Sequence, residues 1–257
     1  MNTPAVALFQ FDAWQWTLLA IGAVLMGVSK TGVSGLSVLF AGLFASLMPA
    51  KVASGFALPL LMLGDFIAVA SYRQHTRWQH LWRMFPATAL GVIVGYFAMS
   101  RITDRQATTL VGSIICSLVA LHAWRRWRLS RGELGEHGWW FAATIGVLAG
   151  FATLIANAAG PLMAIYFLAL RLPKMEFMGT GATFYLLMNF FKLPFMIHLG
   201  LITPASLSAA MWLTPAVVAG TLLGRVILQR INQKWFESTI LALAVLAGLN
   251  VLRQAWH

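Results

Sequence analysis

One apolar segment near the start of the chain is interrupted by the stretch Ser29-Lys30-Thr31-Gly32-Val33-Ser34-Gly35. Apolar runs lie directly on both sides of this stretch, at 13–29 and 32–48. The stretch is polar and rich in glycine, but it is too closely flanked to be an ordinary loop outside a membrane. It therefore predicts a hydrophobic segment whose helix is broken part-way along its length.

A second interruption of the same kind occurs later in the chain. The stretch Ala156-Asn157-Ala158-Ala159-Gly160-Pro161 separates the apolar runs 139–155 and 158–170. The remaining apolar runs are 52–72, 81–99, 107–124, 175–198, 206–227 and 235–252. Runs of about 20 residues can cross a hydrocarbon core about 30 Å thick, so these runs predict membrane-spanning segments along the whole chain.

The composition excludes a water-soluble domain and favours helices. Of the 257 residues, 60% are hydrophobic and 10% are charged, whereas a soluble domain carries about 25% charged residues. Backbone groups in a bilayer must be satisfied within the segment, and the apolar runs are continuous rather than alternating as in a β-barrel. We therefore expect an all-α polytopic membrane protein.

The two interruptions open two related halves of the sequence. Pro49 and Gly55 in the first half are repeated as Pro173 and Gly179 in the second, and Asp65 then falls opposite Asn189. The stretch from Pro86 through Gly91 to Gly95 likewise matches that from Pro215 through Gly220 to Gly224. Weak internal symmetry of this kind is typical of transporter folds. We predict a first repeat at 1–128, a cytoplasmic linker at 129–138 and a second repeat at 139–257, within one integrated transmembrane domain.

The distribution of Arg and Lys distinguishes two topologies. If each broken segment crosses the membrane, the positive charges divide almost equally between the two sides. If each is a re-entrant hairpin followed by three transmembrane helices, most positive charges share one side, as the positive-inside rule requires. The charges on that side are Arg73, Arg77, Arg83, Arg125, Arg126, Arg128, Arg131, Arg171, Lys174, Arg230 and Lys234. This favours inverted repeats in a bacterial inner membrane with both termini in the periplasm, although fully spanning broken helices stay open as an alternative.

The interruptions also predict a central substrate site. Irregular backbone at membrane depth is tolerated where it is buried in protein or lines a water-filled cavity, and helix N-termini at such breaks attract anions. We expect one helix to start near Thr31 to Ser34 and another near Asn157 to Pro161, with Asn157 as a helix cap. The predicted substrate-binding residues are Ser29, Lys30, Thr31, Gly32, Ser34, Asn157 and Gly160. Alternatively, these small residues only allow close helix packing, and Lys30 extends to the membrane interface.

Three further polar residues lie inside long apolar runs: Asp65, Asn189 and Lys192. Ionisable groups within a membrane are candidates for function, so we predict a coupling or gating role, with Asp65 pairing with a lysine or carrying a proton. The alternative is a structural ion pair between two helices. Tyr166, Tyr185 and Thr183 are additional candidates for a transport pathway.

The order of these motifs resembles the TauE/SafE sulfite exporter family, also called the TSUP family. The resemblance rests on Gly160-Pro161-Leu162-Met163-Ala164, on Leu172 to Thr180, on Met48 to Gly55 and on Trp78 to Gly95. It implies export of sulfite, of a sulfonate such as sulfoacetate, or of a similar sulfur oxyanion. The sequence departs from the family at both interruptions, where polar residues replace denser glycine clusters, and its single cysteine, Cys116, lies outside them.

The expected partners follow from this interpretation. They are a small anionic substrate, the lipid bilayer, protons as a candidate coupling ion and a second copy of the chain in a homodimer. We expect no nucleic acid, although the net charge is +11, because the charges lie in short loops, and we expect no cofactor or metal site. A carrier of another anion such as a carboxylate is the alternative, followed by an integral membrane enzyme, for which the sequence shows no nucleophile–base pair.

Overall fold

The computed structural model describes residues 11–32, 36–99 and 139–240, together with 101, 103, 105–106, 109, 113, 242–243 and 246. The predicted linker at 129–138, Ser34 and Cys116 lie outside the described residues. The described elements are α2 (Ala13–Thr31), α3 (Ser37–Leu47), α4 (Ala50–Tyr72), η2 (Arg73–His75), α5 (Trp78–Met99), α7 (Trp139–Ala156), α8 (Ala159–Ala169), α9 (Lys174–His198), α10 (Pro204–Trp212) and α11 (Thr214–Arg230). Residues 233–240 are helical as well, and the described residues contain no strand.

Several of these helices have the length and composition of membrane spans, as the sequence predicts. The segments Lys51–His75, Trp78–Met99 and Trp139–Ala156 are each long and apolar enough to cross a membrane, and α10 with α11 adds a fourth if the bent pair counts as one span. Tryptophans near the helix ends are exposed, including Trp14 and Trp140 at 68% each. Exposed indoles at such positions are typical of a membrane–water interface.

Both predicted interruptions are present. The first separates α2, which ends at Thr31, from α3, which begins at Ser37. The second separates α7 from α8, and there Asn157 has a φ of 52°. This left-handed conformation is uncommon outside glycine but is tolerated by asparagine, so Asn157 ends α7 and lets the chain change direction.

A third interruption was not predicted. The apolar run 206–227 was expected to form one segment, but it forms α10 and α11, which meet at Leu213 with a bend of 51°. Pro215 lies in the first turn of α11, where its missing N–H costs no hydrogen bond, and it disfavours helical backbone in the residue before it. Its repeat partner Pro86 lies inside the continuous helix α5, so the proline alone does not determine the bend.

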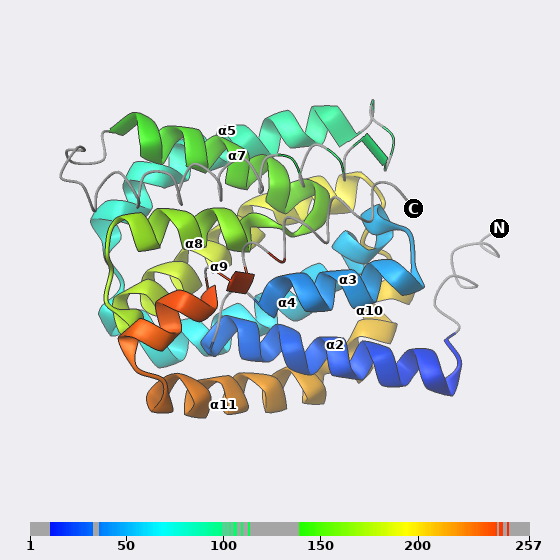
Figure 1. The fold of residues 1–257 in the computed structure, drawn as a ribbon. Coiled ribbons are helices and arrows are strands. Elements are labelled where there is room, and N and C mark those ends of the chain that lie inside the picture. The colour runs from blue at the N-terminus through cyan, green and yellow to red at the C-terminus, as the bar shows by residue number, and fades with distance from the viewer. Residues whose placement is uncertain are drawn as a thin grey trace.

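Helices from the two parts of the chain are intermixed. α2 packs along α11 on one side of the molecule, and α5 packs along α7 on the other (Figure 1). Both contacts depend on glycines, because a Cβ at Gly91 would lie 2.0 Å from the carbonyl oxygen of Val147, and one at Gly220 would lie 2.2 Å from that of Val24. The first helix after each predicted repeat start therefore packs against a helix from the other repeat.

The long helices α4 and α9 pack against each other between these two layers. A Cβ at Gly55 would lie 2.2 Å from the carbonyl oxygen of Leu201, and one at Gly179 would lie 2.6 Å from that of Tyr72. Each of these two glycines, which correspond in the sequence repeat, thus lets the end of the partner helix approach closely. The α4–α9 pair carries the polar side chains described next.

Candidate functional site

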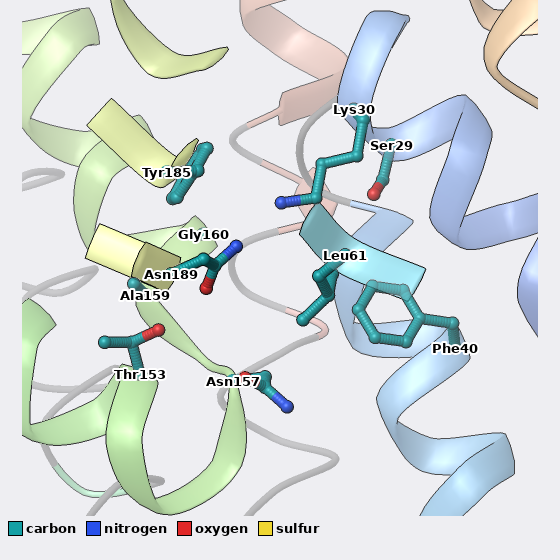
Figure 2. Close-up of a pocket in the computed structure, with 10 residues that line it drawn as sticks. All are labelled: Ser29, Lys30, Phe40, Leu61, Thr153, Asn157, Ala159, Gly160, Tyr185 and Asn189. Carbon is teal, nitrogen blue, oxygen red and sulfur yellow. The ribbon is translucent and has the colours of Figure 1, made fainter. Parts of the chain in front are cut away.

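A pocket lies where the two predicted interruptions meet α4 and α9. The pocket is partly open, and its space, including solvent at its mouth, is about 400 Å³. Its lining residues are Ser29, Lys30, Phe40, Leu61, Thr153, Asn157, Ala159, Gly160, Tyr185 and Asn189. Figure 2 shows Lys30 extending from the end of α2 toward Tyr185 and Asn189, with Thr153 and Asn157 below them. The pocket thus combines polar side chains with the apolar residues Phe40 and Leu61.

Lys30 forms a buried ion pair in this pocket. Its Nζ lies 2.6 Å from Oδ1 of Asp65, and the two side chains are 9% and 0% exposed. The other carboxylate oxygen of Asp65 accepts a hydrogen bond of 2.5 Å from Nδ2 of Asn189. Lys30 Nζ also lies 4.8 Å from the ring centroid of Tyr185, a cation–π distance. Lys30 therefore points into the protein, and the predicted pairing with Asp65 is present.

A second buried lysine lies just behind the pocket wall. Lys192 is 0% exposed, and its Nζ donates to the carbonyl oxygen and to Oγ1 of Thr153, both at 3.2 Å. It also donates to Oδ1 of Asn157 at 2.5 Å. Nδ2 of Asn157 in turn donates to the carbonyl oxygen of Ser54 at 3.0 Å. This network connects α4, α7 and α9 through side chains at the second interruption.

The predicted helix starts need correction. Lys30 lies in the last turn of α2, and the next helix begins at Ser37, so Lys30 is at the C-terminal end of a helix. Asn157 does not cap α8, because Ala158 is the N-cap and no side chain bonds there; the amide of Asn157 is used by Lys192 and Ser54 instead. Within the described residues, the pocket is therefore lined by the start of one helix, at Ala159 and Gly160.

The predicted substrate-binding residues divide into two groups. Ser29, Lys30, Asn157 and Gly160 line the pocket, but Thr31 and Gly32 do not. Thr31 donates from Oγ1 to the carbonyl oxygen of Thr221 at 2.6 Å, and a Cβ at Gly32 would lie 2.8 Å from the carbonyl oxygen of Gly224. Thr31 and Gly32 therefore stabilise the packing of α2 against α11. For these two residues, the structure agrees with the alternative in which they only allow close helix packing.

Of the three residues predicted to line a transport pathway, one lies in the pocket and two do not. Tyr185 lines the pocket, whereas Thr183 donates to the carbonyl oxygen of Gly179 at 3.0 Å and Tyr166 is buried in the apolar core. Thr153 was missed by the sequence reasoning. It lies four residues before Asn157, and this helical spacing places two side chains on the same face.

In the described part of the chain, no group of three or more His, Cys, Asp or Glu side chains is placed to hold a metal ion.

Comparison with known families identifies the chain. The family model described as sulfite exporter TauE/SafE matches residues 18–251. The chain belongs to the TauE/SafE sulfite exporter family. This family consists of membrane transporters, which agrees with the apolar helices of the fold. Comparisons with curated proteins and with solved structures found no match.

Proposed function

We propose that this TauE/SafE protein is a secondary transporter that exports a small sulfur-containing anion, such as sulfite or the sulfonate sulfoacetate, from the bacterial cytoplasm. The observation that carries the proposal is the pocket beside the helix interruptions. It combines the ammonium group of Lys30, two amide side chains and the start of α8. Ammonium groups, amide N–H groups and helix N-termini all favour oxyanions.

The ion pair of Lys30 with Asp65 supports a role for protons in this transport. An anion that binds at Lys30 competes with Asp65, because both are negatively charged and Nζ lies only 2.6 Å from Oδ1. A displaced carboxylate in an apolar fold gains stability by taking up a proton. We therefore propose that Asp65 exchanges a proton as the anion binds and leaves, with Asn189 holding the carboxylate in place.

Anion binding is tested by thermal stability of the purified protein in detergent. Sulfite, thiosulfate and sulfoacetate are expected to raise the melting temperature, because a ligand that binds only the folded state stabilises it. Acetate and choline chloride serve as controls for a carboxylate and a cation. A larger shift with acetate than with any sulfur anion would favour the carboxylate carrier instead. Sulfite flux in proteoliposomes with an imposed pH gradient then tests proton coupling.

We further propose that the two halves, 1–128 and 139–257, are inverted repeats that form a single transport unit. The equivalent close contacts of Gly91 with Val147 and of Gly220 with Val24 support this arrangement, as does the pairing of α4 with α9. An odd number of full spans per repeat, with each broken segment returning to its own side, gives the strong asymmetry of Arg and Lys.

The inverted arrangement predicts the location of the C-terminus. A reporter enzyme that is active only in the periplasm is expected to give full activity when fused after His257 in cells. A reporter active only in the cytoplasm, fused at the same position, is expected to give background activity. The opposite result would contradict the re-entrant topology, and insertion of both reporters into the 129–138 linker provides the reciprocal control.

A further inference from the structure

Lys192 is a buried charge that the proposed anion site does not yet explain. Its side chain is 0% exposed. Whereas Lys30 is paired with Asp65, no carboxylate in the described part of the chain forms an ion pair with Lys192. Its three acceptors are neutral oxygens of Thr153 and Asn157. Burial of an ammonium group with neutral partners is costly, which makes Lys192 a candidate for a functional role.

The partners of Asn157 determine which way its amide faces. An ammonium group has only donors, so the side of the amide facing Lys192 must be the oxygen. A carbonyl group has only an acceptor, so the side facing Ser54 must be the nitrogen. The bonds of 2.5 Å to Lys192 and 3.0 Å to Ser54 therefore specify one orientation. Figure 2 shows the amide nitrogen of Asn157 directed away from Thr153.

This orientation affects what an anion meets in the pocket. Asn157 lines the pocket, whereas Lys192 does not. One N–H of the amide is used by Ser54, and the second has no acceptor among the described residues. Without Lys192 only the bond to Ser54 holds the amide, and an amide that turned would present its oxygen, which repels an anion. A lysine at this position thus keeps a donor available to the pocket.

We propose that Lys192 is a positioning residue that determines specificity: it holds the amide oxygen of Asn157 so that the pocket presents an N–H donor to an anion. This inference rests on the proposed anion transport. It gives Lys192 a role in substrate specificity, which differs from the coupling or gating role predicted from the sequence. Lys192 acts through Asn157, whereas Lys30 lines the pocket directly.

A double-mutant cycle tests the proposal, with the dissociation constant for sulfite measured by calorimetry on the full chain in detergent. Lys192→Met and Asn157→Gly are each expected to weaken sulfite binding by about tenfold or more, since each removes a donor oriented toward a charged ligand. Glycine is chosen at 157 because it tolerates a φ of 52° without strain. The dissociation constant of the double variant is expected to be no larger than the larger of the two single-variant values, because both changes remove the same N–H from the pocket.

Lys174→Met is the matched control. Lys174 also donates its Nζ to neutral oxygens, the carbonyls of Leu228 at 3.0 Å and Ile231 at 2.5 Å, but it does not line the pocket. This variant is expected to lose thermal stability and to keep the wild-type dissociation constant. Additive effects of Lys192→Met and Asn157→Gly, or wild-type binding in Lys192→Met, would overturn the proposal.

Two further variants keep the test decisive if Lys192→Met does not fold. Lys192→Arg retains the charge and the donors, so its dissociation constant is expected to be closer to that of the wild type than that of Lys192→Met. Asn157→Asp replaces the N–H with an oxygen while retaining a partner for Lys192, and is expected to abolish sulfite binding. Wild-type binding in Asn157→Asp would refute the role of the amide. Absence of sulfur-anion binding in the wild-type protein would instead refute the proposed function itself.

Discussion

A Lys30→Met variant is expected to lose sulfite transport in proteoliposomes almost completely. Lys30 is the cation that lines the pocket, and its Nζ is held in place by Asp65 at 2.6 Å. A hydrogen bond to a charged group contributes about 1.5–3 kcal/mol, which corresponds to about 10- to 150-fold in affinity. Methionine retains most of the volume of the lysine side chain, so the apolar packing around the stem changes little.

The unpaired Asp65 left by this substitution must be separated from the loss of the substrate contact. Removing one partner of a buried pair costs about 3–5 kcal/mol when the other stays charged. The double variant Lys30→Met with Asp65→Asn restores a neutral pocket and is expected to fold at wild-type levels, yet still to lack transport. Lys234→Met serves as a control, because Lys234 is exposed. Wild-type flux in the double variant would exclude Lys30 as the anion site.

Substitution of Gly91 by leucine is expected to prevent assembly of the fold. A Cβ at this position would lie 2.0 Å from the carbonyl oxygen of Val147 and 3.0 Å from the backbone nitrogen of Phe151. Since both atoms belong to the backbone of α7, α5 and α7 must separate along their shared face. We expect a loss of about 3 kcal/mol or more, at the upper end of the costs observed for overpacking.

The effect of Gly91→Leu is measured by the yield of monodisperse protein in detergent and by its melting temperature. Gly181→Ala is the matched control, since a Cβ there would meet only side-chain atoms at 3.5 Å or more, an ordinary van der Waals contact. That variant is expected to behave as wild type. Equal yield and stability of Gly91→Leu and Gly181→Ala would contradict the close α5–α7 contact.

Much of the architecture follows from local sequence patterns. Polar, glycine-rich stretches inside apolar runs predicted both helix interruptions, because several such residues in succession disfavour a continuous membrane helix. The pairing of Lys30 with Asp65 was also among the predicted arrangements, since a charge in an apolar fold requires a partner. The interruptions depend on residue types within short stretches of sequence, and the pairing depends on the small number of charged residues inside apolar runs.

Other features depend on which helices become neighbours. Thr31 was predicted to bind substrate, but its hydroxyl bonds to the carbonyl oxygen of Thr221, a residue of α11 whose position the sequence alone does not specify. The bonds of Lys192 to Thr153 and Asn157 likewise depend on how α7 meets α9. The bend at Leu213 was missed because Pro86 and Pro215 have the same local context but different structures.

The packing of α2 against α11 has a consequence for biosynthesis. Leu19, Ala23 and Met26 of α2 are 0% exposed in the finished protein, yet the hydrogen bond from Thr31 to Thr221 spans 190 residues of chain. At about 5–20 residues per second, the ribosome reaches α11 about 10 to 40 s after it completes α2. During that interval, the buried face of α2 lacks α11, its partner in the folded protein, so this face must wait for a helix made much later.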